Sequence, residues 1–371
     1  MAKEMAKATT VSIKKLKSLE IDQMLQFEIS DIDVSHVNAI RRVILAEIPT
    51  IAIAYDPYKP KESDIQFVKN NSVLHNEFVG HRLSIVPLYF KAEEIDAYDP
   101  DQYKFVIHKK NTTTESIDVT TDDIRYENNY GTAKPISEIF PRDPLTKDPI
   151  IISKLKPNIM NPSNGEELHI VFSARKDIAK KHARWCAVST CVYENTMDEE
   201  RVKLARENIT DSKLLNAFDS IEKYRIFKTN KYGEPNSFKF TIVSECALTP
   251  KEILLNSVKV IRAKLAALVS EEGKYEVQKQ NDLYIITVHE EDHTLGNLVQ
   301  SYIYNKYVRE SSEIEYVGYY QPHPLESDII FKLKPTPEKD GAFAFDKFIK
   351  GVAKEMMQSF DDIGKLVTKK L

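Results

Sequence analysis

The 371-residue chain has few cysteines, few glycines and no long apolar segment. Its three cysteines are too few for a disulfide framework, and their odd number is typical of a reducing compartment. No apolar run approaches the roughly 20 residues needed to cross a bilayer, and residues 1–10 lack the apolar stretch of a secretory signal. We therefore expect an intracellular protein without a membrane segment, in which residues 1–10 form a flexible tail.

The chain also lacks an excess of positive charge. Lys and Arg total 52 against 56 Asp and Glu, which gives a formal net charge of −4 at pH 7. Proteins that bind free nucleic acid usually carry a basic excess, so a stand-alone DNA-binding factor is disfavoured and any contact with DNA is expected only through a larger assembly. The 42% hydrophobic and 29% charged residues are ordinary for globular domains, and the length allows two or three of them.

Motifs of the common enzyme classes are absent as well. The ten glycines form neither G-x-G-x-x-G nor a phosphate-binding loop, and the sequence contains no G-x-S-x-G and no H-E-x-x-H. We therefore expect no catalytic residues. The alternative is a stand-alone enzyme whose site lies in residues 90–235.

Two groups of side chains offer metal-ligand chemistry. Asp31 and Asp33 are spaced closely enough to hold magnesium, but such a pair before a helix more often forms a turn and a cap. The second group consists of His182, Cys186, Cys191 and Cys246. Its spacing matches no common zinc module, and buried free cysteines are common. We expect no bound metal and no cofactor.

An internal repeat is the strongest positive feature. Residues 35–49 and 294–308 each begin with a hydroxyl residue and then run apolar at helical spacing. Ser35 precedes Asn38 as Thr294 precedes Asn297. A hydroxyl residue at this place predicts the N-cap of a helix. A repeat of this kind indicates two related half-units packed on each other in one chain.

Two longer helices are predicted near residues 250–269 and 343–367, and each has one narrow apolar stripe. The first stripe contains Leu254, Val258, Ile261, Leu265 and Leu268; the second contains Phe345, Phe348, Val352, Met356, Phe360, Ile363 and Val367. A buried Leu, Ile or Phe is worth about 2 kcal/mol, so both stripes should be covered. We expect the two helices to pair with each other, and the alternative is that each packs on its own sheet.

Two shorter helices combine apolar faces with arginine and histidine. In the first, ending near Ile48, Val37, Ile40 and Ile44 share one face, Arg41 flanks it, and Arg42 points outward, either to a partner or to solvent. The second covers about 73–85. Its first apolar face holds Leu74, Phe78 and Ile85, and its other face holds Val79 and Leu83. Arg82 lies between these faces. His81 falls on the first, where we expect it in the core, and two apolar faces suggest a helix sandwiched by another subunit.

These motifs resemble signatures of multisubunit RNA polymerases. Asn38–Thr50, Val73–Leu88 and the His-Ala-Arg-Trp segment at 182–185 are similar to the third-largest, alpha-like subunit. The C-terminal segments Asp292–Leu298, Gly318-Tyr319 and Pro322–Leu325 resemble the small eleventh subunit, the usual dimer partner of the third. The resemblance covers most of the chain, although apart from 182–185 the segment 90–235 is weakly covered.

The resemblance implies an α+β fold in which two alpha-like dimerisation half-units, each a sheet with helices, pair intramolecularly through long helices. We expect a flexible tail at 1–10, an alpha-like half-unit at 11–89 and 236–270, an inserted, mostly β domain at 90–235, a linker at 271–280, and an eleventh-subunit-like half-unit at 281–371. The role of the charged segment 197–231 is open.

The resemblance also implies a non-catalytic assembly platform whose partners are the largest and second-largest polymerase subunits and small zinc-binding subunits. Its implied large-subunit contacts are Arg41, Arg42, His81 and Arg82. Its implied dimerisation residues are Val37, Ile40, Ile44, Leu254, Val258, Ile261, Leu265, Leu298, Phe348, Val352, Met356 and Phe360. Its implied motif residues are His293, Thr294, Leu295, Gly296, Asn297, Pro322, His323 and Pro324. The first five are expected to face the largest subunit or support the dimer.

Two departures from the family pattern stand out. The two subunits are separate chains in cellular polymerases and are joined here, which resembles the arrangement in some large DNA viruses and implies a monomer that is internally a pseudo-heterodimer. If the source is viral, we expect the host cytoplasm and the virion, and otherwise the nucleus. Residues 86–185 contain no cysteine, so the zinc or iron–sulfur centre of many relatives is not expected.

Overall fold

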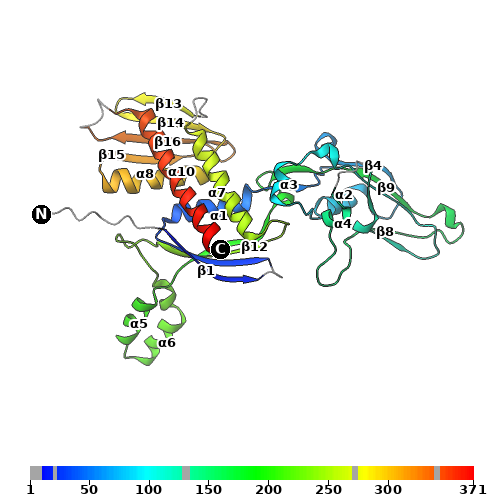
Figure 1. Ribbon diagram of the computed structural model, residues 1–371, viewed down its shortest axis with the longest axis horizontal. Coiled ribbons are helices and arrows are strands. Elements are labelled where there is room, and N and C mark those ends of the chain that lie inside the picture. The colour runs from blue at the N-terminus through cyan, green and yellow to red at the C-terminus, as the bar shows by residue number, and fades with distance from the viewer. Residues whose placement is uncertain (1–10, 20–22, 128–133, 270–274, 338–342) are drawn as a thin grey trace. The chain divides into compact units, whose positions relative to one another are not determined.

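The computed structural model describes residues 11–19, 23–127, 134–269, 275–337 and 343–371 (Figure 1). The expected tail at 1–10 lies outside these residues. The chain divides into two compact units: unit 1 contains Met1–Leu45, Thr190–Val243 and Pro250–Leu371, and unit 2 contains Ala46–Ser189 and Ser244–Thr249. Among the helices in the described ranges, none is both long and apolar enough to span a membrane.

The N-terminal half of unit 1, residues 11–45, 190–243 and 250–269, is built on a four-stranded sheet. Its strand order is β1 (Ser12–Leu19), β2 (Met24–Ser30), β12 (Ser237–Ser244) and β11 (Val188–Asn195). The alternation in β2 buries Leu25, Phe27 and Ile29 on one face. Phe27 stacks on Phe240 of β12 with ring centroids 5.2 Å apart. The helices of this half include α1 (Val34–Ala46) and α7 (Pro250–Ala267).

The C-terminal half of unit 1, residues 275–337 and 343–371, is built on a second four-stranded sheet. Its strand order is β13 (Tyr275–Gln280), β14 (Leu283–His289), β16 (Asp328–Pro335) and β15 (Ile314–Tyr320). Its helices are α8 (His293–Ile303), the π-helical segment η7 (Tyr304–Glu310) and α10 (Phe345–Lys370). The sequence predicted a linker at 271–280, but residues 275–280 form the edge strand β13, and residues 271–274 lie outside the described ranges. The polar pattern hid this strand because all but its first residue are exposed.

Helices α7 and α10 lie side by side in Figure 1, as the two apolar stripes predicted. They run antiparallel: Lys251 Nζ donates to the carbonyl of Thr368 at 3.1 Å, and Arg262 Nε pairs with Asp361 at 2.9 Å. The stripe of α7 is buried, including Leu254, Val258, Ile261 and Leu265. The buried stripe of α10 contains Phe345, Ile349, Val352, Met356, Phe360, Ile363 and Val367. Phe348 was predicted in this stripe but is only half-buried, and Ile349 occupies the covered position instead.

A short helical hairpin projects from the sheets of unit 1 (Figure 1). It contains α5 (Glu199–Glu207), α6 (Ser212–Ser220) and the 3₁₀ turn η6 (Glu222–Arg225). The Arg206 guanidinium binds Asp219 across the hairpin at 3.0 Å, and Phe218 of α6 is buried. This hairpin lies within the charged segment 197–231.

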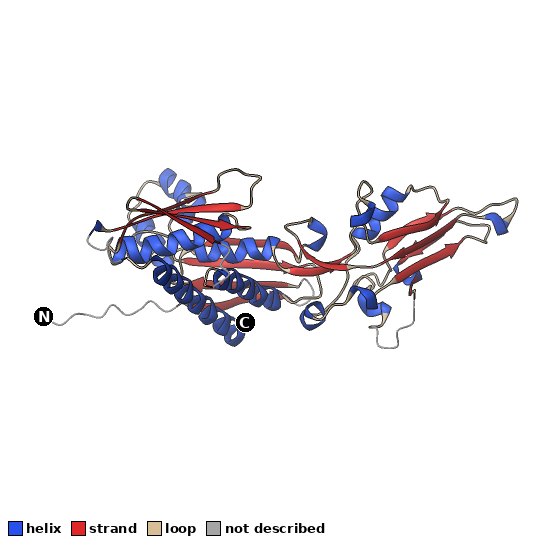
Figure 2. Cartoon of the chain, turned by 90° about the horizontal axis from the view of Figure 1, so that it is seen from above, coloured by secondary structure: helices blue, strands red, loops and turns tan. Residues whose placement is uncertain are grey.

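Unit 2 consists mainly of antiparallel strands with short helices (Figure 2). Its largest sheet has the order β4 (Ile65–Asn70), β9 (Glu167–Phe172), β5 (Phe105–Lys110) and β7 (Ile124–Tyr126). Two-stranded sheets pair β10 (Arg175–Ile178) with β3 (Pro49–Ala52) and β6 (Ile117–Thr120) with β8 (Ile151–Leu155). The α-helices are α2 (Asn76–Ser84), α3 (Ala92–Asp96) and α4 (Ile136–Ile139). The 3₁₀ turns are η1 (Pro60–Glu62), η2 (Pro100–Gln102), η3 (Thr121–Asp123), η4 (Pro162–Asn164) and η5 (Ala183–Trp185).

The compact units have different boundaries from the domains expected from sequence. Residues 46–89 belong to unit 2, with most of the expected insert, whereas residues 190–235 belong to unit 1. The reason is strand pairing, because β11 extends the sheet of β2 and β12 while β3 pairs with β10.

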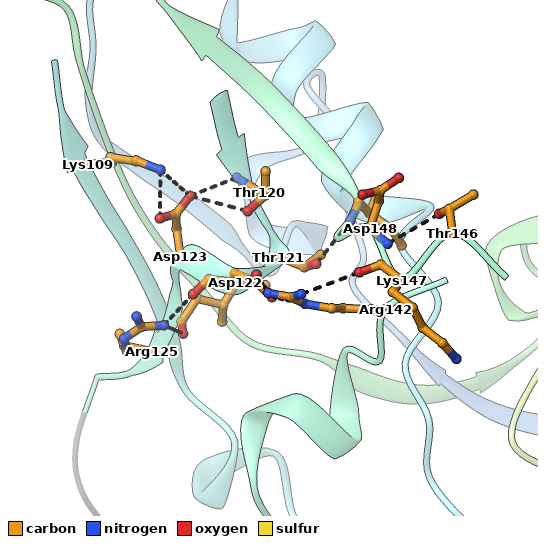
Figure 3. A network of polar contacts seen from close by, with 12 residues as sticks. Lys109, Thr120, Thr121, Asp122, Asp123, Arg125, Arg142, Thr146, Lys147 and Asp148 are labelled. Atoms are coloured by element: carbon orange, nitrogen blue, oxygen red, sulfur yellow. Dashed lines mark hydrogen bonds and ion pairs between the residues drawn. The ribbon is translucent and has the colours of Figure 1, made fainter. Parts of the chain in front are cut away.

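A polar network stabilises one loop region of unit 2 (Figure 3). The Asp123 carboxylate accepts the backbone N–H of Thr120 at 2.9 Å and both its oxygens lie 2.8 Å from Lys109 Nζ. Arg142 binds Asp122 and also donates to the carbonyl of Lys147 at 3.4 Å. Lys109 and Asp123 are both partly buried. Their ion pair connects β5 with η3, and the bond from Thr120 adds β6, so these charged side chains have a structural role.

Candidate assembly interface

The two halves of unit 1 start their central helices in the same way. Asp33 accepts the backbone N–H of Ser35 at 2.8 Å, and Asp292 accepts that of Thr294 at 2.8 Å. The residue two positions before each aspartate has a left-handed backbone: φ is +61° at Asp31 and +59° at Glu290. The predicted hydroxyl caps are therefore wrong. The caps are the aspartates two positions earlier, whose carboxylates reach the first free N–H groups.

The internal repeat places a polar group of each half at the helix start of the other. Arg42 of α1 donates from Nε to Thr294 Oγ1 at 2.9 Å, and its Nη2 lies 4.0 Å from Asp292 Oδ1. In the other direction, Asn305 Nδ2 donates to Asp33 Oδ2 at 3.0 Å. This exchange of contacts joins the two halves at both helix starts, through a different donor from each half. Arg41 takes no part in the exchange and donates to Asn38 of its own helix at 3.0 and 3.1 Å.

Most of the residues that the resemblance implies for dimerisation are buried in the apolar core of unit 1. Eleven of the twelve are buried: Val37, Ile40, Ile44, Leu254, Val258, Ile261, Leu265, Leu298, Val352, Met356 and Phe360. Sequence reasoning missed His36, which is 6% exposed and stacks on Phe360 with ring centroids 5.2 Å apart. Burial lowers the pKa of His36, against the opposing effect of nearby Asp33. The neutral imidazole therefore behaves as part of the core.

The motif at the start of α8 packs against β15. An added Cβ at Gly296 would lie 2.5 Å from the Tyr319 ring, so only glycine lets this ring approach the helix so closely. The Tyr319 hydroxyl lies 3.2 Å from His293 Nδ1. Leu295 and Thr294 are buried. Asn297 is half-buried and its Oδ1 accepts the Ser301 hydroxyl at 3.4 Å. Pro322, His323 and Pro324 are exposed in the loop after β15, where His323 Nδ1 accepts the N–H of Leu325 at 3.2 Å.

Replacing Gly296 by alanine tests this packing. Because the new methyl group would overlap the Tyr319 ring, we expect a loss of about 1–3 kcal/mol in the free energy of unfolding. Chemical denaturation measures the loss. The matched control is Gly351→Ala in α10, where an added Cβ meets nothing within 4 Å, and this change should not destabilise the helix because alanine has the higher helix propensity. Equal losses in both variants would contradict the proposed Tyr319 contact.

Helix α2 of unit 2 presents one apolar face outward. Val79 and Leu83 are fully buried, whereas Phe78 is 63% and Ile85 59% exposed. His81 was expected in the core but is exposed, since the covered face is the other one. Periodicity shows two faces and not which of them the sheet covers. Nearby, Arg82 Nη2 donates to the carbonyl of Ile151, itself 48% exposed, at 2.7 Å.

Two of the sequence motifs border the same hollow in unit 2, which has a volume of about 760 Å³. It is lined by His81 of α2 and by His182, Arg184 and Trp185 of the second motif. Arg184 donates to the carbonyls of Ile53 and Tyr55 at 3.0 Å. Burial, then the charges of Arg184 and His81, lower the pKa of His182. The hollow is thus framed by rigidly held polar groups next to the exposed face of α2.

The cysteines and carboxylates considered as metal ligands have other contacts. Cys186 Sγ lies 3.1 Å from the carbonyl of Val188, Cys246 Sγ lies 3.5 Å from that of Ala187, and Cys191 is buried. Asp33 caps α1. Across the described ranges, no group of three or more His, Cys, Asp or Glu side chains is arranged to hold a metal ion.

Comparison with known proteins explains the repeated architecture. A family model described as the RNA polymerase Rpb3/Rpb11 dimerisation domain matches residues 26–265, and a second model of the same description matches residues 284–362. The chain belongs to the RNA polymerase Rpb3/Rpb11 dimerisation-domain family. It is an Rpb3-like polymerase subunit of the non-catalytic kind. The first match runs from β2 to α7 and the second from β14 into α10, so both members of the α7–α10 pair lie in family segments.

Similar full-length proteins are Rpb3-type subunits. "DNA-directed RNA polymerases IV and V subunit 3B" of Arabidopsis thaliana is 28% identical over 326 residues, covering 73% of this chain and 93% of the relative. "DNA-directed RNA polymerase II subunit RPB3" of Schizosaccharomyces pombe is 26% identical over 284 residues, covering 70% and 86%. "DNA-directed RNA polymerase subunit Rpo3" of Methanosarcina acetivorans is 24% identical over 275 residues, covering 67% and 94%.

Proposed function

We propose that this chain is the single-polypeptide equivalent of an Rpb3–Rpb11 heterodimer and serves as the assembly platform of a DNA-directed RNA polymerase. The observation that carries the proposal is the burial of α7 against α10 within one compact unit, each helix coming from a different match to the dimerisation family. The platform binds the second-largest and largest subunits and small zinc-binding subunits. It contacts DNA only through the complex and is a monomer by itself.

Joining the two halves in one chain changes the energetics of assembly. A short tether makes pairing intramolecular, with an effective concentration on the order of mM. Separate subunits at cellular concentrations pair less completely unless their affinity is high. The fused chain therefore presents a complete platform at any expression level. The joined subunits resemble the arrangement in some large DNA viruses. The relatives named above are cellular, so a viral source stays a prediction from sequence.

We infer that the exposed face of α2 is a docking surface for a large polymerase subunit. Val73, Phe78, Ile85 and Ile151 are each about half exposed or more, which places several large apolar groups on one part of unit 2. Burying such groups at an interface gains about 25 cal/mol per Å² of apolar area, and Arg is favoured among the residues that dominate such interfaces. Arg82 is held beside this face by Ile151. His81, Arg41 and Arg42 remain proposed contacts.

Co-expression with the two large subunits tests this function. The affinity-tagged chain should capture both large subunits, and Phe78→Ser should reduce capture at least about tenfold if Phe78 is an anchor of the interface. Arg42 is unsuitable for this test because it also binds Thr294 in the other half. Leu145→Ser is the matched control, since Leu145 is an exposed side chain in a loop of the same unit. Undiminished capture by the Phe78 variant would refute the docking surface, and no capture by the unaltered chain would refute the platform.

A further inference from the structure

The polar contacts between the two halves of unit 1 are not symmetric, although the halves are related. Ser35 and Thr294 are 259 positions apart, as are Asn38 and Asn297. At the same spacing, Arg42 corresponds to Ser301, so the C-terminal half has no arginine at this place. Each half therefore carries donors that the other lacks.

The C-terminal half contributes a second set of donors from η7. Arg309 binds Glu234 through two parallel hydrogen bonds, Nη1 to Oε2 at 3.1 Å and Nη2 to Oε1 at 2.8 Å. Its guanidinium carbon also lies 4.3 Å from the ring centroid of Tyr232 and 5.1 Å from that of Tyr304. A guanidinium between two aromatic rings and a carboxylate has a narrowly defined position.

The π-helical geometry of η7 determines which way its side chains point. Tyr302 and Tyr307 are five positions apart, and both hydroxyls bind the same oxygen of Glu355 in α10, at 3.1 and 2.8 Å. Residues five apart are aligned in a π turn and diverge in an α-helix. Lys306 adds a contact to the other Glu355 oxygen at 2.8 Å. The wide turn is thus fixed to α10 on one side, which leaves Asn305 and Arg309 directed at the N-terminal half.

The N-terminal half has no counterpart of this segment. Helix α1 ends at Ala46, the position that matches Asn305. If two N-terminal halves from different copies paired, Arg42 could still reach the opposite helix start. Glu234 would then lose the Arg309 guanidinium, and Tyr232 would keep only Lys231 of its own half, whose Nζ lies 4.8 Å from the ring centroid. If two C-terminal halves paired, Ser301 would stand in place of Arg42 and the Thr294 contact would be lost.

We propose that two polar contacts, Arg309 with Glu234 and Arg42 with Thr294, determine the pairing specificity of the two halves. They favour pairing of each half with its tethered partner over pairing with the same half of a second chain. The stripe of α7 is aliphatic and that of α10 adds Phe345 and Phe360. Apolar packing has no directional bonds, and the two polar pairs add contacts that a like pair would lose. Specific pairs commonly combine such attraction with an unsatisfied charge in the wrong pair. This specificity would keep newly made chains from joining through like halves. It is a property of the purified chain alone, so its test does not depend on whether α2 binds a large subunit.

The test separates the halves after folding. A protease site is inserted between Ala267 and Tyr275 of the full chain, the folded protein is cut, and samples of two isotopic masses are mixed. Native mass spectrometry then counts mixed and like pairs. We expect the unaltered cut protein to re-pair as N-terminal with C-terminal fragments. Arg309→Glu should raise the ratio of N–N to N–C pairs about tenfold, since it replaces a surface ion pair by a repulsion, and adding Glu234→Arg should restore the original ratio.

The matched control is Arg206→Glu. Arg206 also binds a carboxylate through two nitrogens, Nε and Nη2 at 3.0 Å each, but its partner Asp219 lies in the same half. This variant should leave the pair ratio unchanged. If Arg309→Glu fails to fold uncut, Arg309→Met removes the charge alone and should shift the ratio in the same direction by less. Like pairs as frequent as mixed pairs in the unaltered protein, or no restoration by the reversed pair, would overturn the proposal.

Discussion

Replacing Phe360 by alanine should lower the free energy of unfolding by about 3–5 kcal/mol, the largest effect we expect from a single side chain. Phe360 is fully buried in α10 and stacks on His36 of α1, so it belongs to the seam between the two halves. Its removal loses transfer free energy and leaves a cavity that two helices cannot both close. Urea unfolding followed by circular dichroism gives the value, provided the transition is two-state.

Phe348→Ala on the same helix is the control for Phe360→Ala. Phe348 is half-buried and contacts Tyr307 with ring centroids 4.9 Å apart. We expect a loss of about 1–2 kcal/mol, because less area leaves water on folding and no closed cavity forms. If the two variants lost equal stability, Phe360 would not occupy the centre of a seam.

Acidification below pH 6.5 should destabilise unit 1 through His36. Because burial lowers the pKa of His36 in the folded protein, the unfolded chain binds this proton more readily. The stabilisation from the neutral imidazole is fully present when the pH is above the pKa of histidine in the unfolded chain, about 6.5. It is lost as the pH falls toward the pKa of His36 in the folded protein. Each pH unit in this window costs up to about 1.4 kcal/mol. We therefore expect the free energy of unfolding to fall between pH 7 and pH 5.

The groups around His36 define the control. Asp33 raises the pKa of His36 through its charge, but less than burial lowers it, and Tyr302 lies 6.4 Å away between ring centroids. His36→Phe keeps an aromatic ring against Phe360 and removes the titration. Its unfolding free energy should therefore change by less than the unaltered protein's between pH 7 and pH 5. Parallel pH profiles for the two proteins would assign the acid sensitivity to other groups.

The sequence pattern predicted the parts of the fold that depend on local periodicity. The stripes of α7 and α10 were visible because residues three and four apart share a helix face, and their mutual pairing is confirmed. Phe348 and Ile349 show the limit of this reasoning, since neighbouring apolar residues differ by only about 100° around a helix. The Asp33 and Asp292 caps were also readable, because Asp is as good a cap as Ser or Thr.

Features that depend on distant partners had no local signal. The Arg309–Glu234 contact joins residues 75 positions apart, and the π turn at η7 has no recognised sequence signature. The burial of His36 follows from α10, which lies more than 300 residues later in the chain. The exposed face of α2 was misassigned for the same reason: the helix offers two apolar faces, and only the tertiary structure decides that Val79 and Leu83 are covered.

The central claim is that the two halves of unit 1 pair within a single molecule, and a double-cysteine variant tests it most directly. An added Cβ at Gly364 of α10 would lie 3.6 Å from Val258 Cγ1 of α7, which is compatible with a disulfide. Val258→Cys with Gly364→Cys, oxidised at nanomolar concentration, should give a monomer with an internal cross-link between residues 258 and 364 in peptide mapping. Either single variant should give no such peptide. Cross-linked dimers, or free thiols at both positions, would contradict the account.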